Sequence, residues 1–96
     1  MSDKELLELA AKAAGIEWNK AYKAHLNENG AHWLPLTDDG DAFRLAVKLK
    51  FDIRFGYDWG APVVNVNSYR VTLRDDPYAA TRQAIVRAAA EIGRTL

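Results

Sequence analysis

The residues from Phe51 to Trp59 alternate between large apolar side chains and polar residues or glycine, and this pattern constrains the fold most strongly. Such alternation is typical of a β-strand that buries one face. We therefore expect the apolar stripe from Phe51 to Tyr57 to belong to the hydrophobic core.

Two shorter strands are expected after this one. Val63–Val66 is a short apolar run, and Tyr69–Arg74 alternates again. The segment Gly60-Ala61-Pro62 interrupts the first strand, and Asn67-Ser68 fits a tight turn. Connections this short join only antiparallel neighbours, so the sequence predicts a three-stranded antiparallel meander.

Two amphipathic helices are predicted before the meander. The first covers residues 3–14, where Ser2 and Glu5 fit a capping box and Gly15 fits the position after a helix end. The second follows Thr37, which we expect to be its N-cap, and has acidic residues in its first turn. Its predicted buried stripe contains Ala42, Leu45, Ala46 and Leu49, widened by Phe43 and Val47.

A third helix is predicted after the meander. Asp76 fits the N-cap, and Pro77 fits the first helical position, where its missing N–H is not needed. The expected apolar stripe contains Ile85, Ala88, Ala89 and Ile92, extended upstream by Tyr78. Arg82 is expected to face water, and the many alanines are expected to let this helix lie close against the sheet.

The segment 17–36 has no single periodicity. Helical spacing and strand alternation both fit Trp18 and Tyr22, while Asn29-Gly30 favours a hairpin turn. We predict an irregular hairpin, with 31–34 as its return strand.

These elements predict an α+β fold in which three helices pack with an antiparallel sheet of three to five strands. The order is helix, hairpin, helix, three-stranded meander, helix. The chain has 96 residues, so residues 1–96 are expected to form one domain. Cysteine is absent, and neither a membrane span nor a secretory signal is recognisable, so we expect a cytoplasmic protein without disulfides.

Three blocks of the sequence resemble a family of small phage and prophage proteins, the phage alpha-beta-alpha sandwich domain family. The blocks are Glu5–Gly15, Trp33–Ala42 and Asp76–Arg82, and with their helices they cover more than half of the chain. The resemblance implies a phage accessory protein, with no established catalytic residues to carry over. It also implies helices on both faces of the sheet, whereas the alternation of the strands indicates one wetter face.

Two groups of residues contain side chains of the kinds that bind metal ions. Asp38, Asp39 and Asp41 offer clustered carboxylates for Ca²⁺ or Mg²⁺, but their spacing departs from an EF-hand loop, and helix capping is the favoured interpretation. His25 and His32 lie seven apart and would form a metal site only if the hairpin brought them together near a carboxylate. No metal or other cofactor is therefore predicted.

A candidate binding surface is predicted on the polar face of the strands, where arginines lie beside aromatic residues. Its members are Arg54, Tyr57, Trp59, Arg70, Thr72 and Arg74, with Trp33 as a further candidate. This composition is typical of protein hot spots and of single-stranded nucleic-acid platforms. Thirteen basic residues balance thirteen acidic ones, so a protein partner is favoured over nucleic acid. A merely solvated sheet face is the competing interpretation.

No recognisable catalytic set is present, since the chain lacks cysteine, a Gly-x-Ser-x-Gly motif and a phosphate-binding glycine motif. We expect a non-enzymatic phage accessory protein that binds a host macromolecule, as an inhibitor of host defence or regulation. The alternative is a protein that binds a small ligand such as a nucleotide, stacked on Trp33 or Trp59. A metal-dependent hydrolase is the third option. An exposed strand edge also makes a homodimer an open possibility.

Overall fold

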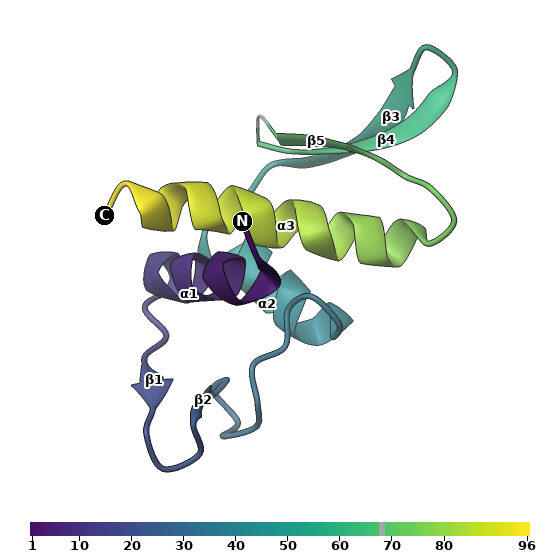
Figure 1. Cartoon of the computed structure of the whole chain (residues 1–96). Helices are drawn as coiled ribbons and strands as arrows, with labels where there is room; N and C mark the ends of the chain where they lie inside the picture. The colour runs from purple at the N-terminus through teal and green to yellow at the C-terminus, as the bar shows by residue number, and fades with distance from the viewer. Residues whose placement is uncertain (68) are drawn as a thin grey trace.

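The structure, a computed structural model, describes residues 1–67 and 69–96. Within these residues, helices and two antiparallel sheets form an α+β fold in the predicted order (Figure 1). The elements are α1 (Asp3–Ala14), β1 (Trp18–Asn19), β2 (Ala24–His25), α2 (Asp39–Lys48), β3 (Ile53–Asp58), β4 (Ala61–Val66), β5 (Tyr69–Thr72) and α3 (Pro77–Arg94). None of the helices in this described part is long and apolar enough to span a membrane.

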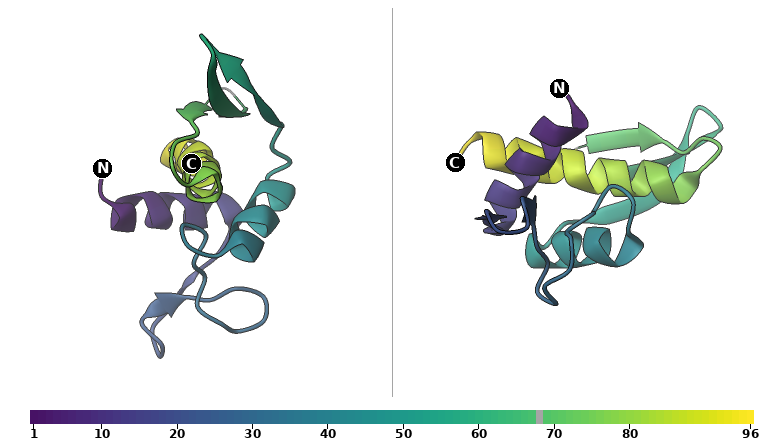
Figure 2. Two further views of the ribbon diagram at one scale, coloured as in Figure 1. Left: turned by 90° about the vertical axis from the view of Figure 1, so that its right-hand side faces the viewer. Right: turned by 60° about the horizontal axis from the view of Figure 1, so that its bottom comes forward.

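The crossing of α1 and α3 forms the centre of the fold (Figure 2). Both helices contribute alanines to the core, and these alanines are almost completely buried: Ala10, Ala11, Ala14, Ala84, Ala88, Ala89 and Ala90. At Gly93 even a methyl group would not fit, because an added Cβ would stand 1.9 Å from the carbonyl oxygen of Leu9. The small residues of α3 therefore bring it close to α1 as well as to the sheet.

The three-stranded sheet, in the order β3-β4-β5, packs on the other side of α3. Val64 and Val66 of β4 are completely buried on the helix-facing side. In the described part of the chain only α3 covers this sheet, and it covers one face. This arrangement agrees with the alternation of the strands and not with helices on both faces.

The prediction that the stripe from Phe51 to Tyr57 is core is wrong for its second half. Phe55 is 64% exposed and Tyr57 is 80% exposed. The register places Phe55 beside Val64 on the same face, but α3 packs on β4 and β5, and β3 is the outer strand. The β3–β4 hairpin thus projects beyond the helix (Figure 1). Alternation identifies an apolar face, and it does not reveal whether a second layer covers that face.

The second helix differs from its prediction at its start and along one side. Its N-cap is Asp38 and not Thr37, because the Asp38 side chain accepts a hydrogen bond from the Asp41 N–H at 2.8 Å. Ala42, Leu45 and Ala46 are buried as predicted, and Leu49 packs against the core, but Phe43 and Val47 are exposed. The reason is that α2 packs against α3 along one stripe only.

The third helix begins as predicted, with Asp76 as N-cap and Pro77 in the first turn. Three predictions about its sides are wrong. Tyr78 and Ile92 are both exposed, so the buried stripe contains Ile85, Ala88 and Ala89 but neither of these two residues. Arg82 does not face water, because its Nε donates to the Leu36 carbonyl at 2.9 Å and its guanidinium pairs with Asp39. Arg82 thereby ties α3 to the start of α2.

The segment 17–36 is an irregular hairpin, as predicted, although its pairing differs in detail. β1 pairs with β2 across residues 20–23, and the segment 27–31 forms a second turn that is closed by an isolated bridge between Leu26 and His32. Instead of the expected return strand over 31–34, the structure contains only this isolated bridge at His32. The predicted turn at Asn67-Ser68 lies partly outside the described residues.

Candidate binding surface

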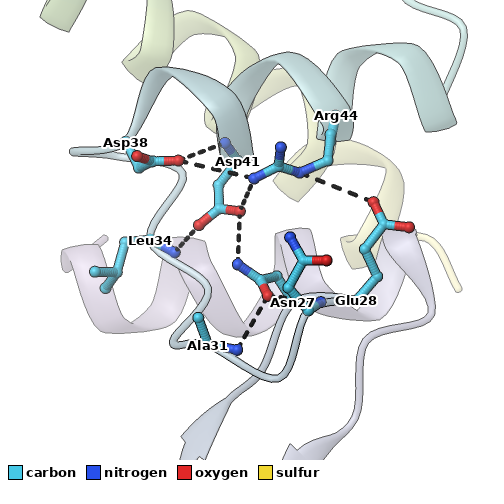
Figure 3. Close-up of polar contacts among 8 residues, drawn as sticks. Asn27, Glu28, Ala31, Leu34, Asp38, Asp41 and Arg44 are labelled. Carbon is cyan, nitrogen blue, oxygen red and sulfur yellow. Dashed lines mark hydrogen bonds and ion pairs between the residues drawn. The ribbon is translucent and has the colours of Figure 1, made fainter.

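A buried carboxylate joins the segment before α2 to the helix itself. Asp41 is 2% exposed and accepts hydrogen bonds from the Leu34 N–H at 2.9 Å, from Asn27 at 3.2 Å and from Arg44 at 2.7 Å (Figure 3). Arg44 also approaches Asp38 and Glu28, each at 3.9 Å. The Asp41 carboxylate therefore connects the segment 27–34 to α2 and also pairs with the Arg44 guanidinium.

The electrostatics of Asp41 identify it as a structural group. Burial by itself raises the pKa of the carboxyl, but the hydrogen bonds from Leu34, Arg44 and Asn27 outweigh burial and hold the pKa below its ordinary value. Every buried polar side-chain atom in the described residues has a hydrogen-bond partner. No group of three or more metal-binding side chains gathers in the described chain. Asp38 caps α2 by accepting from the Asp41 N–H, in agreement with the interpretation of the acidic cluster as helix capping.

The histidines do not form a joint site with a carboxylate in the described chain. The ring of His25 lies edge-on to Trp18, with centroids 5.1 Å apart, and edge-on to Trp33 at 6.0 Å. Burial between these rings lowers the pKa of His25, because desolvation disfavours the charged imidazolium. His25 is thus a packing residue of the β1–β2 segment.

Trp33 does not belong to an exposed surface, contrary to its prediction as a candidate binding residue. It is 6% exposed and is part of the core. Trp33 lines an open groove of about 450 Å³ between the end of α1 and α2. The exposed residues Phe43 and Val47 line the same groove, together with Arg44 and Lys48 of the same helix.

Trp59 occupies the two-residue turn between β3 and β4. Asp58 pairs with Ala61 across this turn, and φ is positive at both Trp59 (55°) and Gly60 (82°), as in a type I′ turn. Glycine adopts this conformation freely, whereas a residue with a Cβ loses about 1–2 kcal/mol in the left-handed region. The indole is 99% exposed, so packing within the described chain does not offset that cost.

The arginines near this turn are charge-paired and do not form a basic patch. Arg54 contacts Asp52 at 3.0 Å, and Arg70 contacts Asp58 at 2.9 Å. Arg70 also donates to Asn65 at 3.0 Å, so its side chain crosses the polar face of the sheet. The two aspartates therefore balance the charges of the two arginines.

The predicted surface residues are therefore only partly brought together. Arg54, Tyr57 and Trp59 share the projecting hairpin, and Arg70 reaches it through Asp58. Thr72 and Arg74 instead line a separate hollow where β5 leads into α3. Sequence reasoning missed the exposure of Phe55 and the burial of Asp41, since neither depends on local spacing.

Comparison of the chain with protein-family models, with curated proteins and with solved structures finds no match in any of the three. The geometry of the β3–β4 hairpin is consequently the main basis for a functional proposal.

Proposed function

We propose that the protein is a non-enzymatic accessory protein of the phage type, which binds a host protein in the host cytoplasm, and that Trp59 anchors this contact. The observation that carries the proposal is the indole of Trp59, which is 99% exposed at a φ of 55°. A bulky residue at positive φ is uncommon, and such outliers concentrate at functional sites. Tryptophan is also among the side chains most enriched at binding hot spots.

The surroundings of Trp59 support a protein as the partner. Nucleic-acid binding depends on excess positive charge, but Arg54 and Arg70 are neutralised by Asp52 and Asp58. Protein interfaces have an apolar core and a polar rim. In such an interface the indole would enter an apolar pocket of the host protein, and the paired arginines would contact the polar rim around it. The resemblance of the helices to phage accessory proteins supports interference with host defence or regulation as the biological role.

The test compares wild-type protein with Trp59→Asn as bait in host lysate, followed by titration of the purified partner. Asparagine suits the first position of a type I′ turn, so the hairpin is retained. Loss of a hot-spot tryptophan is expected to raise the Kd by roughly 30-fold. Tyr78→Ser, which removes an exposed aromatic ring from α3, is the matched control and should leave the Kd within about twofold. An equal Kd for wild type and Trp59→Asn would refute the assignment of Trp59.

A second candidate function is binding of a small anionic ligand with an aromatic ring, such as a nucleotide. The groove of about 450 Å³ beside Trp33 favours it, since its size suits a small molecule and Lys48 supplies a positive charge at its lining. A ligand at a hundredfold excess over its Kd would stabilise the fold by about 2.7 kcal/mol. A thermal-shift screen of nucleotides tests this function, and Val47→Asp should abolish any shift. No shift across the panel would exclude the nucleotide class.

A further inference from the structure

The outer edge of β3 carries backbone groups that lack a neighbouring strand in the described chain. The Asn67 N–H donates to the Asp52 carbonyl at 2.8 Å, which fixes the direction of the backbone groups across the β3–β4 pair. Because these groups point alternately to the two sides of a strand, the even-numbered residues of β3 point toward β4. The N–H and C=O groups of Ile53, Phe55 and Tyr57 therefore point outward.

We propose that two copies of this chain pair along this edge, antiparallel and centred on Gly56. In that register Arg54 of each copy lies opposite Asp58 of the second copy, and Phe55 lies opposite Tyr57. Opposite charges and aromatic pairs directly across two strands both stabilise a sheet. The sequence of β3 is thus complementary to itself.

The hydrogen-bond geometry selects the same register. Phe55 and Tyr57 have outward backbone groups, so each can exchange two hydrogen bonds with the other residue in the second copy. A shift by one residue would place the apolar face of one copy beside the polar face of the other. Centring on Phe55 would instead place Asp52 opposite Asp58, which is a repulsive pair.

Gly56 provides an independent argument for a close approach at this point. A Cβ added at Gly56 would have no atom within 4 Å, so packing within the chain does not require glycine here. Glycine inside a strand weakens it and often marks the close approach of another backbone. In the proposed dimer the two Gly56 residues face each other as a non-hydrogen-bonded pair, where Cα atoms are only about 4.5 Å apart.

The result is a continuous six-stranded sheet with both α3 helices on the same face. Pairing brings the exposed rings of Phe55 and Tyr57 from both copies together beside the two-fold axis, between the two helices. Both charged partners lie at the surface: Asp58 is held by Arg70 at 2.9 Å, and the Arg54 side chain is 76% exposed although it contacts Asp52 at 3.0 Å. Trp59 lies beyond the paired segment, so this inference goes beyond the proposed host contact and does not depend on it.

The test measures the self-association of the purified protein by sedimentation over a concentration series. Wild type should form a dimer, whereas Arg54→Glu and Asp58→Lys should each weaken it by roughly tenfold, because each creates like-charged pairs across the interface. An equimolar mixture of the two variants should regain the wild-type affinity. In the mixed dimer the introduced carboxylate at position 54 faces the introduced ammonium at position 58, and the native Arg54 faces the native Asp58.

Two further variants sharpen the test. Arg74→Glu changes the same charge outside β3 and should leave the Kd within about twofold. Phe55→Pro removes an outward N–H without removing a bond to β4, and it should give a folded monomer by circular dichroism and sedimentation. A wild-type protein that stays monomeric, a mixture no tighter than the single variants, or a dimeric Phe55→Pro would overturn the proposal. None of these results involves the host protein, so they leave the role of Trp59 to its own test.

Discussion

The carbonyl oxygen of Leu9 in α1 lies so close to Gly93 in α3 that a Cβ at position 93 would stand 1.9 Å from it. Real Cβ atoms do not approach an oxygen this closely, so the two helices must separate if position 93 carries a side chain. Among the described residues, the contact between α1 and α3 is the most extensive contact between two elements of the fold. A single glycine thereby sets the distance between the two helices that form the centre of the fold.

Gly93→Ala is expected to destabilise the protein by about 2 kcal/mol or more in chemical denaturation, because overpacking exceeds the gain in helix propensity. Gly40→Ala in α2 is the matched control, since the atoms nearest to its Cβ would be side-chain atoms of Arg44 and Asp38 at 3.2 Å, and not backbone. It should be neutral or stabilising by up to about 1 kcal/mol. Equal effects of the two substitutions would contradict the close packing of α1 on α3.

Asp41→Asn is expected to cost about 2–3 kcal/mol in the same assay, because an amide cannot accept all the hydrogen bonds that converge on the buried carboxylate. Glu28→Gln is the control, because the Glu28 carboxylate also faces Arg44 but is exposed and lies 3.9 Å from it. This substitution should change the stability by less than about 0.5 kcal/mol. A small effect at position 41 would show that the network of Figure 3 contributes little.

The lowered pKa of Asp41 also predicts a loss of stability in acid. Since the folded state favours the ionised carboxylate, the stabilisation is complete above the ordinary pKa of 3.8 and is lost as the pH falls through the lowered pKa of the folded state. Denaturation curves measured between neutral pH and strong acid should therefore fall more steeply in wild type than in Asp41→Asn. Parallel curves would disprove this linkage.

His25 predicts a separate pH dependence at higher pH. Its pKa is lowered in the folded state, so the unfolded chain binds the proton first, and stability decreases as the pH falls from about 6.5 toward the lower folded pKa. His25→Phe keeps a ring between Trp18 and Trp33 but cannot titrate. The stability of this variant should change less than that of wild type between pH 7 and pH 5. Unchanged slopes would exclude His25 as the titrating group.

Trp59→Asn is expected to stabilise the isolated protein by about 1 kcal/mol, because asparagine tolerates positive φ and the exposed indole contributes no packing. Thermal denaturation measures the gain, and Trp59→Ala, which retains the strain of a Cβ without the tolerance of asparagine, is the control. If Trp59→Asn is more stable but binds the partner more weakly, then Trp59 serves binding and not the stability of the fold. Destabilisation by Trp59→Asn would instead reveal a structural role.

The local parts of the fold follow from the sequence alone. Ser2 with Glu5, and Asp76 with Pro77, begin helices where the pattern predicts, because capping depends on neighbouring residues only. The alternation in β3 likewise predicts a strand in an antiparallel meander, which the structure contains. Thr37 and Asp38 are neighbouring residues that can both cap a helix, so the local sequence does not decide between them. The backbone geometry of the structure assigns the N-cap to Asp38.

Burial, in contrast, was decided by the tertiary structure. The apolar periodicity of Phe43, Phe55 and Tyr78 resembles that of core residues, yet all three are exposed because no other layer of the described chain lies over them. Asp41 and Trp33 show the converse, since contacts with distant segments remove a carboxylate and a predicted surface ring from solvent. A sequence determines which faces are apolar and where elements begin, through interactions within a few residues. Which of those faces meet depends on the packing of α1, α2 and the sheet around α3, and that packing leaves the β3 edge and Trp59 open to a partner.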